Sequence, residues 1–280
     1  MTMRILLADG RALLAAGMKE WRVLRRYPTL FLGFLFWPIA LPLSYVFQAD
    51  AYSGTQASVD AFAQRSGTTD IAGFLFLGWA AYMWISMILW GPGTALRTDQ
   101  IRGTLEAVFM TPASRLAIIF GPIVTQVVWA LWMFFVVGLA LVVGFGTHIG
   151  LAEALRAVAV ILVAVPALYG LGALFAAVVL RFGEVHALVQ AVRGVFTALC
   201  GMSFPIIVLP ELARSVALTL PPTYLIADLR SVLLSGAGLV ELLPDLAILF
   251  GIGVLLCAAA IFAFARTERF ARRGGSLAQY

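Results

Sequence analysis

The stretch LRAVAVILVAVPALYGLGALFAAVVL, residues 155–180, decides the fold, because it carries a single charged side chain, Arg156. A helix needs about 20 mostly apolar residues to cross the hydrocarbon core of a bilayer, and this run exceeds that length. Its apolar residues are continuous and do not alternate with polar ones, which excludes a strand of a transmembrane β-barrel. The run therefore predicts a membrane-spanning helix.

The rest of the chain repeats this pattern. Hydrophobic residues make up 62% of the 280 residues and charged residues 12%, whereas a soluble chain has about 25% charged residues. The same composition excludes a disordered chain. We therefore predict an all-α, polytopic membrane protein with six transmembrane helices, at roughly residues 29–48, 71–95, 117–144, 155–180, 188–209 and 243–265.

The two ends of the chain are basic. Residues 1–28 mix six Lys and Arg residues with leucines at mostly helical spacing, which predicts a cytosolic, amphipathic interfacial helix. The first long apolar run begins only after Tyr27-Pro28, so this start does not have the pattern of a cleaved signal peptide. The predicted organisation is this helix, a six-helix transmembrane domain over residues 29–265 and a basic cytosolic tail over residues 266–280.

The basic residues also predict the orientation. Fourteen Lys and Arg residues fall in the ends and in the loops on the same side, and only Arg65, Arg214 and Arg230 fall in loops on the other side. Because basic loops stay in the cytosol, we expect both termini to be cytosolic, in a multi-pass protein of the cell (inner) membrane. The net charge of +5 is explained by this topology, and no nucleic-acid partner is expected.

Catalytic patterns are missing from the sequence. A phosphate-binding Walker loop ends in Gly-Lys-Ser/Thr, but the one lysine, Lys19, follows Met18. His148 and His186 lack the spacing of a zinc protease, and no Gly-x-Ser-x-Gly occurs. We therefore expect no enzyme, no metal site and no cofactor in this chain.

Polar residues form a stripe on the fifth segment. His186, Gln190, Arg193 and Thr197 are spaced to share one helical face. An arginine near the helix centre costs about 2.5 to 3.5 kcal/mol on insertion scales, so the face should meet a cavity or a partner helix, although Arg193 could instead snorkel to the headgroups. With Tyr82 and Ser86 of the second segment, we predict a substrate path formed by Tyr82, Ser86, Gln190, Arg193 and Thr197. The alternative for aromatic residues such as Tyr82 is that they pack between helices or form a belt at the membrane interface.

Two connections are distinctive. The inner loop 96–116 is half polar and half apolar and should contain a short helix. The segment 210–242 contains Pro210, Pro221 and Pro222, which break it too often for a membrane span. We expect this second segment to lie in the outer interface or to dip partway into the membrane.

Two sets of motifs resemble one known family. Arg102-Gly-Thr-Leu-Glu106 followed by Thr111-Pro-Ala-Ser-Arg115 is similar to a loop pattern of ABC type-2 exporter permeases. Gly201-Met-Ser-Phe-Pro205, Leu209-Pro210 and Leu220-Pro-Pro-Thr-Tyr224 resemble the late motifs of the same family. The resemblance covers essentially the whole chain.

The resemblance implies a permease subunit that works with two ABC-type ATP-binding subunits, which would bind ATP and Mg, and with a second copy of itself or a paralogous permease. The loop 96–116 would then hold a coupling helix, on which Arg102 and Glu106 are spaced for an ion pair. The residues implied to contact the ATPase are Arg102, Gly103, Thr104, Leu105, Glu106, Phe109, Thr111 and Pro112. The residues implied for an outer gate are Phe204, Pro205, Pro221 and Tyr224. A plain interfacial helix is the alternative for the loop.

The expected function is ATP-driven export of a hydrophobic or amphipathic substrate, such as a drug or a lipid, by alternating access. Within the family, the alternative is a permease for a lipid-linked glycan or polysaccharide. Outside it, the alternatives are a secondary transporter or channel that works without ATP and an assembly protein without a transport path.

Overall fold

The computed structural model describes residues 28–52, 55–101, 123–182 and 185–274, together with the single positions Met18, Arg22 and Arg26. Within these residues the chain forms helices and connections but no strand, which confirms the predicted all-α class for this part. The elements are α2 (Pro28–Tyr52), α3 (Gln56–Ser66), α4 (Ile71–Ile101), α7 (Ile123–Ala140), η1 (Leu141–Phe145), α8 (Leu151–Phe182), α9 (Val185–Leu199), η2 (Ile206–Val208), α10 (Glu211–Ala217), α11 (Pro221–Ser235) and α12 (Leu243–Gly274).

Four of the described helices are long and apolar enough to cross a membrane. The candidate spans are Ile71–Gly91, Gln126–Phe145, Leu151–Val179 and Leu243–Ala263. They coincide with the predicted segments 71–95, 117–144, 155–180 and 243–265. The first predicted segment, 29–48, lies within the helix α2. The total of six transmembrane helices stays a prediction.

The fifth predicted segment, residues 188–209, is shorter than expected. Helix α9 has 15 residues and ends at Leu199, which gives it a length of about 22 Å against a hydrocarbon core of about 30 Å. Gly201 then adopts a φ of +69°, a left-handed conformation that favours glycine. The apolar residues beyond it form a bend and the short helix η2 instead of a continued span. Hydropathy alone extended the predicted helix through this break.

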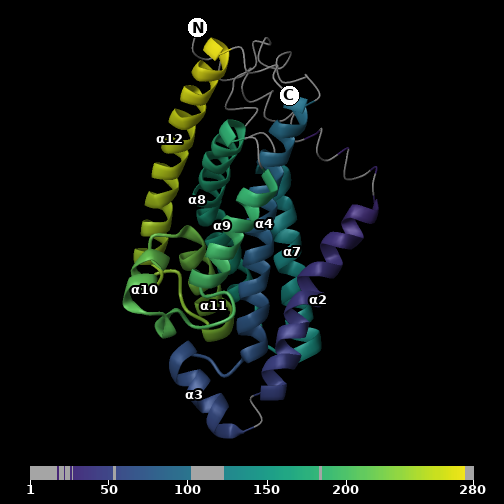
Figure 1. The fold of residues 1–280 in the computed structure, drawn as a ribbon. Helices are drawn as coiled ribbons and strands as arrows, with labels where there is room; N and C mark the ends of the chain where they lie inside the picture. The colour runs from purple at the N-terminus through teal and green to yellow at the C-terminus, as the bar shows by residue number, and fades with distance from the viewer. Residues whose placement is uncertain are drawn as a thin grey trace.

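Helix α4 forms the centre of the bundle. In Figure 1 it runs through the middle of the molecule, and α2, α7, α8, α9 and α11 all pack against it. Its side chains are buried over several turns, among them Phe76, Trp84, Ile85 and Leu89. A helix that is apolar on all sides is typical of such a central position. Helix α12, by contrast, lies at the edge and leaves Phe250, Leu255 and Phe262 exposed.

Helices α8 and α12 make the most extensive contact between two elements. Gly170 of α8 lies against the backbone of Leu256 and Cys257, and Gly253 of α12 lies against Pro166 and Ala167. A Cβ atom on Gly170 would come within 2.8 Å of the Cys257 nitrogen, and one on Gly253 within 2.8 Å of the Ala167 nitrogen. Small residues at such crossings allow two membrane helices to approach closely.

One end of the bundle contains α3, and we call it the α3 end. No helix was predicted between the apolar segments 29–48 and 71–95, where α3 lies. It is a surface helix with no buried residue, and Gly67 caps its C-terminal end. The Asp70 carboxylate accepts hydrogen bonds from the Gly73 nitrogen and the Thr147 hydroxyl, both at 2.7 Å. These bonds join the start of α4 to the loop after η1.

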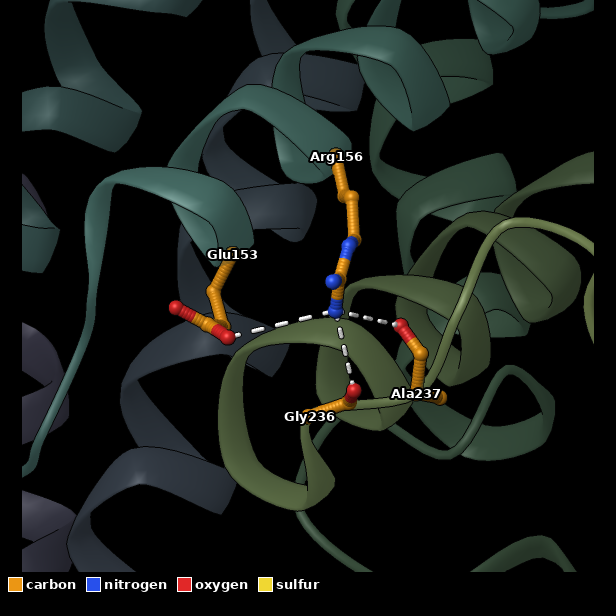
Figure 2. A network of polar contacts seen from close by, with 4 residues as sticks. All are labelled: Glu153, Arg156, Gly236 and Ala237. Carbon is orange, nitrogen blue, oxygen red and sulfur yellow. Dashed lines mark hydrogen bonds and ion pairs between the residues drawn. The ribbon is translucent and has the colours of Figure 1, made fainter.

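The segment 210–242 also lies toward the α3 end and contains α10 and α11 (Figure 1). Neither helix is among the candidate spans of the described chain, as predicted. The nitrogen Nη1 of Arg156, in the first turns of α8, donates to the carbonyls of Gly236 and Ala237 at 3.0 and 3.4 Å, and it lies 3.9 Å from a Glu153 carboxylate oxygen (Figure 2). Arg156 thereby fixes the end of α11 to α8.

Candidate functional site

The predicted substrate-path residues lie on two helices that pack against each other, α4 and α9. The guanidinium carbon of Arg193 on α9 is 5.0 Å from the centre of the Tyr82 ring on α4. This is a cation–π distance. Arg193 Nη1 also donates a hydrogen bond to the side-chain oxygen of Gln190, one turn away, at 3.3 Å. Three of the five predicted residues are thus direct neighbours.

The other two predicted residues use their hydroxyls within their own helices. The Ser86 hydroxyl donates to the Tyr82 carbonyl at 2.7 Å, and the Ser86 side chain is buried. The Thr197 hydroxyl donates to the Arg193 carbonyl at 2.9 Å. Such bonds to the carbonyl four residues earlier satisfy the hydroxyl without a partner from another helix. His186, on the same stripe, makes an edge contact with Trp90 of α4, with ring centres 5.0 Å apart.

An aromatic row continues from Tyr82 toward α2. Trp79 meets Tyr82 edge to face with ring centres 5.1 Å apart, and Tyr45 of α2 stacks on Trp79 at 4.5 Å. The row Tyr45–Trp79–Tyr82 therefore connects α2 and α4 and ends at the Arg193 guanidinium. The sequence indicated the aromatic richness of these segments but not which rings meet.

The bend after α9 is held by a second arginine. Arg230 of α11 donates from Nη1 to the Gly201 carbonyl at 2.7 Å and from Nη2 to the Met202 carbonyl at 2.8 Å. Nε and Nη2 both donate to the Phe74 carbonyl of α4, at 3.1 and 2.8 Å. The guanidinium also lies over the Phe74 ring, 3.3 Å from its centre. Arg230 thus connects three elements through backbone carbonyls.

The residues predicted for an outer gate lie on both sides of this arginine. Phe204 and Pro205 are partly exposed in the bend. Pro221 occupies the first turn of α11 and is buried. The hydroxyl of Tyr224, on the same helix, donates to the Leu218 carbonyl at 2.8 Å. The four residues therefore belong to two elements, the bend and α11, that Arg230 ties together.

Asp228 of α11 was missed as a site residue, although an acid within the apolar run Leu225-Ile-Ala-Asp-Leu229 is a visible signal. Its side chain is completely buried, and neither carboxylate oxygen has a hydrogen-bond partner in the described chain. Burial, together with the negative charge of Asp245, raises the pKa of Asp228 to about 7. A carboxyl with this pKa changes its charge near neutral pH.

The predicted coupling residues, Arg102 to Glu106, Phe109, Thr111 and Pro112, lie outside the described residues. Helix α4 extends to Ile101, so the first part of the predicted loop 96–116 is helical. Among the described residues, no three His, Cys, Asp or Glu side chains come together as a metal site would require.

Comparison with known families assigns most of the chain, from before α2 to the end of α11, to one family. A family model described as "ABC-2 type transporter" matches residues 11–234, which are 224 of the 280 residues. No individual curated protein matches the chain significantly.

Proposed function

Since this chain belongs to the ABC-2 type transporter family and is therefore a membrane permease subunit of an ABC transporter, we propose that it exports a hydrophobic or amphipathic substrate, such as a drug or a lipid. The substrate leaves the cytosol or the inner leaflet by alternating access. Two copies of a separate ATP-binding subunit hydrolyse ATP with Mg. A second copy of this chain, or a paralogous permease, completes the path.

The contact between Arg193 and Tyr82 carries this proposal. A charged side chain within a membrane segment is expensive and marks a substrate or ion pathway by default. Here the guanidinium lies against the Tyr82 ring, in the middle of the candidate span of α4. A snorkelling arginine would extend toward the headgroups, so this contact favours a path through Tyr82, Gln190 and Arg193 that also includes Ser86 and Thr197.

The proposed orientation puts both termini in the cytosol and the α3 end outside. The segment from Phe204 to Tyr224 then closes the outer exit. The loop over residues 102–112 docks on the ATP-binding subunit and transmits its movement. Two rigid arrangements of packed helices, one open to each side, are the usual basis of such a cycle.

The experiment is purification of the tagged chain from its native membranes. We expect a protein with a Walker phosphate-binding loop to copurify in equal amount. The complex, in vesicles that contain a fluorescent lipid, should move the lipid between leaflets with ATP and should stop with vanadate. If the chain instead moved the lipid without the ATPase, along an ion gradient, the proposal would be wrong.

A further inference from the structure

We infer that the substrate carries an anionic group of the phosphate or carboxylate type, and that Arg193 binds this group in the middle of the membrane beside the Tyr82 ring. This inference rests on the proposed function, because it names the substrate class that the same path accepts. The evidence is the depth of the guanidinium, its unused donors and its surroundings.

The first observation is depth. Tyr82 is the twelfth of the 21 residues in the candidate span Ile71–Gly91. At 1.5 Å per residue, it lies about 16 Å from one end of that span and about 14 Å from the other. The Arg193 guanidinium carbon lies 5.0 Å from its ring. The positive charge is therefore near the level at which a bilayer is least able to solvate it.

The second observation is the set of unused donors. A guanidinium has five N–H donors. Arg193 donates one hydrogen bond, to Gln190, and its Nε is buried without a partner. In the described chain no carboxylate oxygen lies within 4.0 Å of it, and the ion pair found there joins Arg156 and Glu153. The protein covers Nε, so the donors left for a ligand are those of Nη2 and the second one of Nη1, which match two oxygens of a carboxylate or phosphate, as arginine binds them in a fork.

Arg230 has a structural role and can be compared with Arg193. Its three nitrogens donate to the carbonyls of Phe74, Gly201 and Met202. Arg156 likewise donates to two carbonyls. Backbone carbonyls therefore accept from all three nitrogens of Arg230 and from Nη1 of Arg156, whereas Arg193 donates to no backbone carbonyl in the described chain, which leaves its donors for a group that arrives from outside.

The third observation is the exposed surface of α9 around Arg193. A Cβ atom added to Gly194, the next residue, would meet no atom within 4 Å. Ala187, Gln190, Ala191 and Gly194 are all exposed on the same part of α9. The Tyr82 ring lies next to the charge, and the buried Trp79 ring packs against Tyr82. A cation with an aromatic wall suits an amphiphile that has one anionic group and an apolar body.

The test begins with binding to the purified chain, without ATPase or ATP. The probes are phosphatidic acid, a fatty acid and phosphatidylcholine in detergent micelles, with inorganic phosphate as the free anion, and the signal is tryptophan fluorescence. We expect the two anionic amphiphiles to bind more tightly than phosphatidylcholine. Competition by inorganic phosphate alone would show that the free anion suffices, whereas binding of the lipids only would assign the site to an amphiphile.

The decisive variants are Arg193→Gln and Arg193→Lys. The first should weaken binding of the anionic amphiphiles by about 10- to 100-fold, the equivalent of one or two charge-assisted hydrogen bonds. The second keeps the charge without the planar fork and should lose less. Arg214→Gln removes an equal charge from the exposed helix α10 and should bind like the parent. The melting temperature of Arg193→Gln should fall only slightly, because the change removes from the folded chain one hydrogen bond to Gln190 and the contact with the Tyr82 ring, whereas the other donors are unused.

Three results would overturn the inference: equal binding of phosphatidylcholine and the anionic lipids, unchanged binding in Arg193→Gln, or a change of oligomeric state in that variant, which would assign Arg193 to a subunit contact. Transport by the complete complex is measured separately. If the parent complex moved no lipid with ATP while Arg193-dependent anion binding was present, the proposed export function would fail and the anion site would stand.

Discussion

Arg230 on α11 donates two hydrogen bonds to the Phe74 carbonyl on α4, from Nη2 at 2.8 Å and from Nε at 3.1 Å, across 156 positions of sequence. The same guanidinium holds the carbonyls of Gly201 and Met202. The bend after α9 therefore depends on a residue that lies almost thirty positions later in the chain.

Arg230→Leu should be strongly destabilising, because it leaves three carbonyls without their donor and each charge-assisted bond contributes about 1.5 to 3 kcal/mol. We expect a loss of about 3 kcal/mol or more, which lowers the melting temperature by roughly 6 to 12 °C. Thermal unfolding in detergent measures this loss of stability. Arg214→Leu, on exposed α10, is the control and should change the stability by less than about 0.5 kcal/mol. Equal melting of the two variants would refute the structural role of Arg230.

Gly78→Ala should destabilise the bend after α9 by a steric clash. A Cβ atom at this position would collide with the Met202 carbonyl and the Arg230 Nη2. Because the carbonyl belongs to the backbone, the bend must shift, and we expect a loss of about 1 to 3 kcal/mol, as for other overpacked sites. Gly138→Ala of α7 meets nothing within 4 Å and should gain up to about 1 kcal/mol from helix propensity. Opposite signs for the two variants in thermal unfolding are the expected result.

Asp228→Asn should make stability less dependent on pH. The pKa of Asp228 rises from 3.8 to about 7 through burial and the charge of Asp245. Between these values the folded chain keeps a proton that the unfolded chain has released, so stability falls as pH rises through this window. The variant cannot ionise and should melt above the parent at pH 8, with a difference that shrinks toward pH 4. Asp60→Asn on exposed α3 should follow the parent at every pH. A constant difference for Asp228→Asn would contradict the assignment.

Phe109→Asp tests the proposed coupling loop. Burial of an unpaired carboxylate at a docking surface costs several kcal/mol, so we expect the ATP-binding subunit to copurify poorly and lipid movement to fall. The melting temperature of the isolated chain should stay unchanged. Ser114→Asp places the same charge outside the proposed docking residues and serves as the control. Normal coupling of Phe109→Asp in vesicles would show that the docking surface lies elsewhere.

Cysteine labelling tests the proposed orientation. In a chain with Cys200 and Cys257 replaced by alanine, Ala57→Cys on exposed α3 should react with an impermeant maleimide added to intact cells. Ser276→Cys in the basic tail should react only after the membrane is opened. External labelling at position 276 would rule out the arrangement with both termini in the cytosol.

Hydropathy and charge were sufficient to predict the helical class and the positions of the long helices, because burial in a bilayer demands long apolar runs. The predicted end of the fifth segment was wrong. Ile206, Ile207 and Val208 are as apolar as the residues of a membrane span, and only Gly201 and Pro205 mark the bend. Helix α3 was missed because a polar surface helix has no apolar stripe. Helical periodicity placed Arg193 and Gln190 on one face of a helix. Which helix packs against that face depends on the tertiary fold, which periodicity does not reveal. Tyr82 and Arg193 were predicted to share one path, but the direct contact of their side chains, and that of Arg230 with Phe74, could not be predicted for this reason.

The glycine contacts between α8 and α12 have a mechanical consequence. With Gly170 and Gly253 each seated against the other helix's backbone, the pair cannot slide or separate by small steps without losing its closest contacts. The two helices should therefore move together as one rigid unit during transport. Movement of this pair against the other helices would then have to be taken up in the connections before α8 and α12, which contain Gly146 and Gly236, each with a left-handed φ.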